Sequence, residues 1–64
     1  MDIDNFQYVL GNIINKYASD YRYSASGITI DCAFSDCPED NETRRLIVQM
    51  TDGERYELLF KKES

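Results

Sequence analysis

The sequence predicts an α+β domain in which one N-terminal amphipathic helix packs on one face of a three-stranded antiparallel meander, in the order α-β-β-β. Residues 1–19 repeat apolar side chains every three or four positions, and most of the remaining chain alternates apolar and polar residues with a period of two. Short connections between the strands favour antiparallel over parallel pairing. Because the 64 residues contain no internal repeat or linker, we expect a single domain over residues 1–64.

The helix is predicted from a stripe of large apolar side chains. Asp4 is the expected N-cap, with Gln7 three residues later completing a capping box. The helix should end near Ala18, where short polar and aromatic residues begin. Its stripe consists of Phe6, Val9, Leu10, Ile13, Ile14 and Tyr17.

The first strand is expected within residues 27–35, with its even-numbered side chains facing the helix: Ile28, Ile30, Cys32 and Phe34. Upstream, Tyr21, Tyr23 and Ala25 alternate on odd numbers, so the phase slips by one residue at Ser26 and Gly27. A glycine at such a slip indicates either a bulge in one long strand or a tight turn between two short strands. The second alternative would make the sheet four-stranded.

The last third predicts a hairpin whose even-numbered side chains also face the helix: Leu46, Val48 and Met50, then Tyr56, Leu58 and Phe60. A two-residue turn at Asp52 and Gly53 would pair Val48 with Glu57, which points to the other face. A three-residue loop over 51–53 instead pairs Val48 with Tyr56 and puts Gly53 in a left-handed conformation. A four-residue loop stays open as an alternative.

The composition excludes several classes of function. A net charge of −5 and a pI near 4.4 oppose direct binding to nucleic acid or to an anionic membrane. No apolar run is long enough to span a bilayer, and the N-terminal residues are acidic where a secretory signal is basic and apolar. We therefore expect a cytoplasmic protein with reduced cysteines.

The segment Asp31 to Glu42 holds both cysteines and several carboxylates. Two cysteines without any histidine make a poor zinc site, and the segment lacks the glycine of a calcium-binding EF-hand loop. We expect no metal or cofactor, with Cys32 as a small core residue and Cys37 as an exposed thiol. A Cys32–Cys37 disulfide is stereochemically conceivable. The loop is either a solvated connection or a recognition loop for a basic partner through Asp36, Glu39, Asp40 and Glu42.

Enzymatic activity is not expected. The chain has no histidine, so the usual general acid-base and the Ser-His-Asp and Cys-His arrangements are missing. Its three glycines lie far apart, so no phosphate-binding loop is present.

A partner-binding surface is predicted on the odd-numbered face of the sheet. Ile47 and Leu59 should lie opposite or diagonal to each other there, near Ala33 and the rings of Tyr21 and Tyr23. We therefore expect a small acidic protein that acts by protein–protein binding, as an adaptor, inhibitor or small regulatory subunit. A homodimer would bury a second face, and an uncovered edge strand offers another route to association. The alternatives are an acidic nucleic-acid mimic that antagonises a nucleic-acid-binding protein and a small metal-binding domain.

Overall fold

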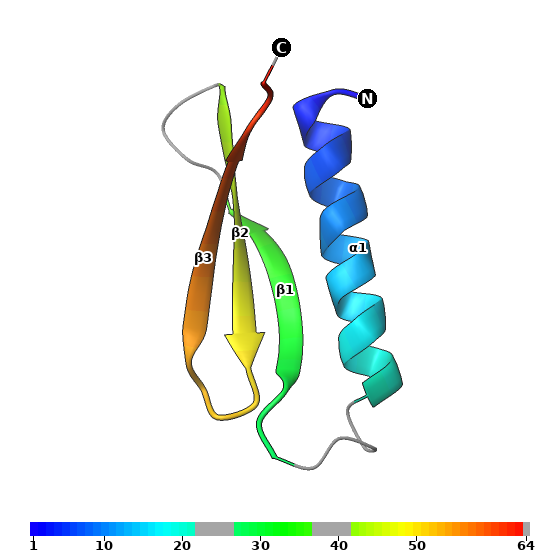
Figure 1. Cartoon of the computed structure of the whole chain (residues 1–64), viewed down its shortest axis with the longest axis vertical. Coiled ribbons are helices and arrows are strands. Elements are labelled where there is room, and N and C mark those ends of the chain that lie inside the picture. Colours follow the sequence, from blue (N-terminus) through cyan, green and yellow to red (C-terminus); the bar gives the residue numbers. More distant parts are fainter. Residues whose placement is uncertain (22–26, 37–41, 64) are drawn as a thin grey trace.

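A computed structural model describes residues 1–21, 27–36 and 42–63 of the chain. One helix, α1 (Ile3–Tyr21), is followed by the strands β1 (Ile30–Asp36), β2 (Thr43–Met50) and β3 (Arg55–Lys61). The strands form an antiparallel sheet in the order β1-β2-β3 (Figure 1). The predicted α-β-β-β architecture is confirmed, and within the described residues the sheet has three strands.

The helix begins and ends at other residues than predicted. The Asp2 side chain accepts a hydrogen bond from the Asn5 backbone N–H at 2.8 Å, so Asp2 and not Asp4 is the N-cap. Asp4 lies in the first turn, where the Arg44 guanidinium bonds it at 2.7 Å and lowers the pKa of its carboxyl. The helix runs on to Tyr21, so the extended conformation expected there is wrong; the rest of that stretch lies outside the described residues.

The β2–β3 hairpin follows the prediction. Val48 lies opposite Tyr56 and Leu46 opposite Leu58, across a loop of three residues. The Met50 N–H donates to the Glu54 carbonyl at 2.8 Å, and the Gly53 N–H donates to the Met50 carbonyl at 3.0 Å. Gly53 has φ 92°, the left-handed conformation that the parity argument required.

The alternation in β1 differs from the prediction because of a bulge. Ile30 lies opposite Met50 and Cys32 lies opposite Gln49, the next residue of β2, so β1 has one extra residue between these two pairs. From there on the odd-numbered residues face the helix: Ala33 lies opposite Val48 and is buried. The predictions that Cys32 and Phe34 face the core, and that Ala33 faces away, are therefore wrong. The bulge lies at Asp31, several residues after the phase slip read from the sequence.

The core is small. Its buried side chains are Ala18, Ala33, Leu46 and Val48, with Leu46 fully enclosed. Partly buried side chains pack around them: Leu10, Ile14, Ile30, Met50 and Phe60. Gly11 lies above Leu46, and a Cβ at Gly11 would meet the Leu46 Cδ1 at 3.6 Å. Gly11 is therefore part of the helix–sheet contact and not a surface glycine.

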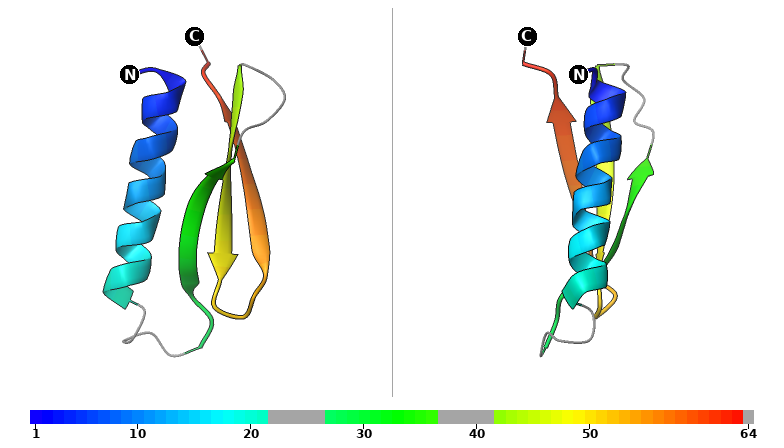
Figure 2. Two further views of the ribbon diagram at one scale, coloured as in Figure 1. Left: turned by 180° about the vertical axis from the view of Figure 1, so that it is seen from behind. Right: turned by 90° about the vertical axis from the view of Figure 1, so that its right-hand side faces the viewer.

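The helix packs on β1 and β2, and Figure 1 shows β1 next to it and β3 on the far side of the sheet. Asn15 fixes this placement. Its side-chain amide donates to the Ala33 carbonyl at 2.9 Å, and its carbonyl oxygen accepts from the Ala33 N–H at 2.8 Å. Gln7 donates to the Arg45 carbonyl at 2.8 Å. In the view along the helix layer, α1 lies in front of the sheet with β1 and β3 emerging on either side (Figure 2).

Candidate binding surfaces

Large apolar side chains remain exposed on the sheet face that carries the helix. They lie on the flank of α1 opposite Asn15 and on the helix side of β3, the strand farthest from α1, and we call them the inner apolar surface. All but Phe60 have between 40% and 60% of their surface exposed. The members are Phe6, Ile13 and Tyr17 on α1 with Tyr56, Leu58 and Phe60 on β3.

The dimensions of the elements explain this exposure. Strands in a sheet lie about 4.8 Å apart, and a helix with its side chains is about 10 Å wide, so one helix covers roughly two strands of three. Asn15 holds α1 over the β1 side through its two bonds to Ala33. The inner face of β3 is therefore left partly without cover, although the even-numbered residues of β3 point toward the helix layer as predicted.

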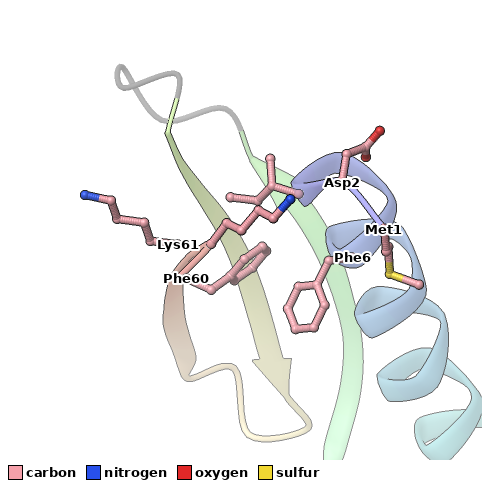
Figure 3. Close-up of a pocket in the computed structure, with 7 residues that line it drawn as sticks. Met1, Asp2, Phe6, Phe60 and Lys61 are labelled. Atoms are coloured by element: carbon pink, nitrogen blue, oxygen red, sulfur yellow. The ribbon is translucent and has the colours of Figure 1, made fainter. Parts of the chain in front are cut away.

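Two hollows lie at the ends of the inner apolar surface. At the N-terminal end of α1, a cavity of about 220 Å³ is lined by Met1, Ile3, Phe6 and Phe60, with Lys61 and Lys62 at its rim. Figure 3 shows the rings of Phe6 and Phe60 turned toward each other between α1 and β3; their centroids are 5.2 Å apart. A second, more open hollow near the other end is lined mainly by apolar side chains, among them Ile13, Tyr17, Ile28 and Met50.

The inner apolar surface was not predicted from the sequence, although the width of the apolar stripe on the helix indicated it. At about 100° per residue, the predicted stripe from Val9 to Ile14 covers about 140° of the helix circumference, which is wider than a single sheet contact needs. The structure buries only one side of that stripe, around Leu10, Ile14 and Ala18. The prediction that the whole stripe packs on the sheet is therefore wrong for Ile13 and Tyr17, whereas Phe6 contacts the sheet through Phe60 and stays 45% exposed.

Ile47 and Leu59 lie on the sheet face that the alternation of β2 and β3 predicted. Ile47 pairs with Glu57 and Leu59 with Arg45, so Ile47 and Leu59 are diagonal neighbours on the face away from α1. Leu59 is 60% exposed and Ile47 is half-buried.

The bulge adds Phe34 to this face, directly opposite Ile47, and we call Phe34, Ile47 and Leu59 the outer patch. The Arg55 guanidinium lies 5.4 Å from the centre of the Phe34 ring. Arg45 pairs with Asp36 at 2.9 Å and with Glu57 at 3.4 Å beside these apolar side chains. The outer patch is therefore interleaved with charged groups.

The predicted acidic recognition loop is only partly described. Asp36 ends β1 in its ion pair with Arg45, and Glu42 lies 3.5 Å from the Lys61 ammonium. Glu39 and Asp40 lie outside the described residues, as does Cys37. Cys32 lies on the outer face, opposite Gln49 and half-buried.

Comparisons with known protein families, with characterised proteins and with solved structures find no match to this chain. Among the described residues, no three thiols or carboxylates come close enough together to hold a metal ion. The described part of the chain has no helix with the length and apolar character needed to cross a membrane.

Proposed function

We propose that this chain is a small non-enzymatic protein-binding module, acting as an adaptor, inhibitor or regulatory subunit, whose inner apolar surface receives an apolar segment of a partner protein. The observation that carries the proposal is the half-exposed state of Phe6, Ile13, Tyr17, Tyr56 and Leu58. Exposed apolar side chains of this size, rimmed by polar groups, are typical of protein contact sites. Aromatic residues, which are enriched at such sites, supply three of the five.

The charge of the chain favours a partner with basic residues around its apolar segment. The net charge is −5, which attracts basic surfaces over distances of about 10 Å in dilute salt. Near the inner apolar surface, Asp20 lies one turn after Tyr17 on α1 in an exposed ion pair with Lys16, and Glu54 accepts a hydrogen bond from the Tyr56 hydroxyl at 3.0 Å. A basic rim on the partner would meet these carboxylates.

The outer patch is the weaker of the two surfaces for this role. Its apolar side chains are fewer, and Arg45, Glu57 and Arg55 lie among them in internal ion-pair and ring contacts. The same contacts make a nucleic-acid mimic less favoured. Asp36 and Glu57 are engaged with Arg45 within the sheet, whereas a mimic requires carboxylates displayed along one surface.

Affinity capture with the full chain tests the proposal. The inner variant combines Ile13→Asp with Tyr17→Ser; both positions are substantially exposed, so the fold should tolerate them. The outer variant combines Ile47→Asp with Leu59→Lys. The matched control is Tyr8→Asp, on the same helix and 70% exposed. Partners captured from the source cells are quantified for each variant by mass spectrometry.

We expect the inner variant to lose a partner that the Tyr8→Asp control and the outer variant both retain. Loss with the outer variant alone would keep protein binding as the function but would overturn the assignment of the inner apolar surface. If all variants capture the same proteins as the native chain, the proposal fails.

A further inference from the structure

The two edges of the sheet differ in their availability for pairing. At the β1 edge, the Asn15 side chain occupies both the N–H and the carbonyl of Ala33, and the helix lies alongside. At the other edge, β3 pairs with β2 on one side only, and no described strand lies beyond it. Residues of an antiparallel pair alternate between hydrogen-bonded and non-hydrogen-bonded positions. Since Met50 and Glu54 are a bonded pair, Arg55, Glu57, Leu59 and Lys61 direct their N–H and carbonyl groups away from β2.

These same residues carry a charge pattern that is complementary to itself. Along the outer face, the sequence reads Arg55, Glu57, Leu59, Lys61 and Glu63: positive, negative, apolar, positive, negative. If two copies of β3 pair antiparallel about a two-fold axis at Leu59, each Glu57 lies opposite the Lys61 of the other copy. Each Arg55 likewise lies opposite a Glu63, and the two Leu59 side chains meet at the axis. All four charged positions then face an opposite charge.

Neighbouring registers lose this match. A two-fold axis at Leu58 places Arg55 opposite Lys61, and an axis at Phe60 places Glu57 opposite Glu63. An axis at Glu57 places that carboxylate opposite itself. Like charges directly opposite each other destabilise a strand pair, so the register centred on Leu59 is selected.

The apolar side chains on the helix side of the sheet favour the same register. With the axis at Leu59, each Leu58 lies opposite a Phe60, so apolar side chains of the two copies meet on the helix side of the sheet. Phe6 already packs on Phe60 at 5.2 Å, and the two inner apolar surfaces become neighbours. Leu59 extends the outer patch across the axis in the same way.

The chain exposes more surface than a compact monomer of its mass, as a chain with an unpaired edge strand does. Its accessible surface is 4867 Å², whereas a compact monomer of 7.5 kDa exposes about 4200 Å². Its radius of gyration is 12.8 Å, against about 10.7 Å for a compact chain of this length. The surplus of roughly 670 Å² is comparable with the roughly 800 Å² that each partner buries in a stable interface.

From these observations we infer that two copies of this chain associate through β3, in the register centred on Leu59, to form one continuous six-stranded antiparallel sheet with both helices on the same face. The inference does not rest on the proposed function. The dimer leaves Ile13 and Tyr17 of each copy outside the strand pair, where a further protein can still bind.

Charge reversal tests the inference through the dimer dissociation constant, measured by analytical ultracentrifugation of the full chain. Glu57→Lys alone and Lys61→Glu alone each replace two attractive cross-strand pairs by two repulsive ones and should each raise the dissociation constant about tenfold or more. Each also breaks one exposed ion pair within its own copy, Glu57 with Arg45 or Lys61 with Glu42. The combined variant Glu57→Lys with Lys61→Glu keeps both of these losses, but it restores opposite charges between the copies and should return the constant to near the native value. The matched controls Asp20→Lys and Lys16→Glu, both exposed on α1, should change it little.

A cross-linking measurement tests the register independently of affinity. In a chain whose two cysteines are replaced by serine, Leu59→Cys puts two thiols opposite each other with Cα atoms about 5.5 Å apart, within disulfide range. Mild oxidation should give a covalent dimer. In the same register, Glu57→Cys puts the two thiols four residues apart along the strand pair, so oxidation should give no covalent dimer.

Three results would overturn the inference: a native chain that sediments as a monomer at all concentrations, a double charge reversal that does not rescue, or a dimer tightened by Lys61→Glu. The last result would indicate the register centred on Leu58. None of them would affect partner capture by the inner apolar surface, so the two proposals fail separately.

Discussion

Asn15 is the residue whose removal tests most directly how the helix is positioned. Asn15→Ala deletes two hydrogen bonds, at 2.8 Å and 2.9 Å, to the N–H and carbonyl of Ala33. Each such bond contributes about 1 kcal/mol net to the free energy of unfolding. In the variant, the N–H and the carbonyl of Ala33 would be hydrated at the β1 edge. Alanine recovers roughly 0.5 kcal/mol through its higher helix propensity, so the expected net loss is about 1.5 kcal/mol.

The control is Asn12→Ala, on the same helix at an exposed position. It makes the same change in helix propensity without losing the contact to Ala33, so the propensity gain cancels between the two variants. The difference in unfolding free energy between them should therefore be about 2 kcal/mol. A domain of this size has a total stability of only about 3–10 kcal/mol, so the change is large.

Urea unfolding at one fixed protein concentration measures this difference, since association would otherwise shift the midpoint. With a slope of about 1 kcal/mol per molar urea, the two midpoints should differ by about 2 M. Amide hydrogen exchange provides a local readout, because the Ala33 N–H should lose protection in Asn15→Ala. Equal midpoints for the two variants, with Ala33 still protected, would show that the amide does not hold the helix to the sheet.

Three further predictions follow from the core, the glycines and a tyrosine. Leu46→Ala, at the fully enclosed core position, should lower the free energy of unfolding by about 2–5 kcal/mol and markedly lower the thermal midpoint measured by circular dichroism. Gly11→Ala should raise the free energy of unfolding by about 0.5–1 kcal/mol, because alanine favours the helix and its Cβ meets Leu46 at an ordinary contact distance. Gly53→Ala should lower the free energy of unfolding by about 1 kcal/mol or more, because φ is 92° at this position. Thermal melts that give both glycine variants the same sign would contradict this. The Tyr56 hydroxyl donates to Glu54, which raises the pKa of Tyr56 above its ordinary value of 10.0. The stability from this bond is therefore complete below pH 10 and is lost as pH rises through the folded-state pKa. Glu54→Gln should return the Tyr56 pKa toward 10.0, and an NMR titration that shows no change would refute the assignment.

Local sequence patterns were enough to predict the element types and the geometry of the hairpin. The three- and four-residue spacing of the stripe specifies a helix, and strict alternation in β2 and β3 puts Leu46 and Val48 on one face and Ile47 on the other. Side-chain direction in a strand has a period of two, so parity excluded the two-residue turn and favoured the three-residue loop with a left-handed Gly53. These features depend on residues that are close in the chain, where local geometry leaves few alternatives.

Which side chains are buried depends on contacts between elements that are distant in the sequence. The bulge at Asp31 reverses the faces of β1, because one extra residue moves every later side chain to the other side, and no local signal places it there. The helix lies toward β1 because Asn15 bonds Ala33, a contact between residues 18 apart in the sequence. Since one helix is too narrow for three strands, this placement exposes Phe6, Ile13, Tyr56 and Leu58. Periodicity identifies which residues are apolar on a given face, whereas burial depends on the lateral position of a distant element.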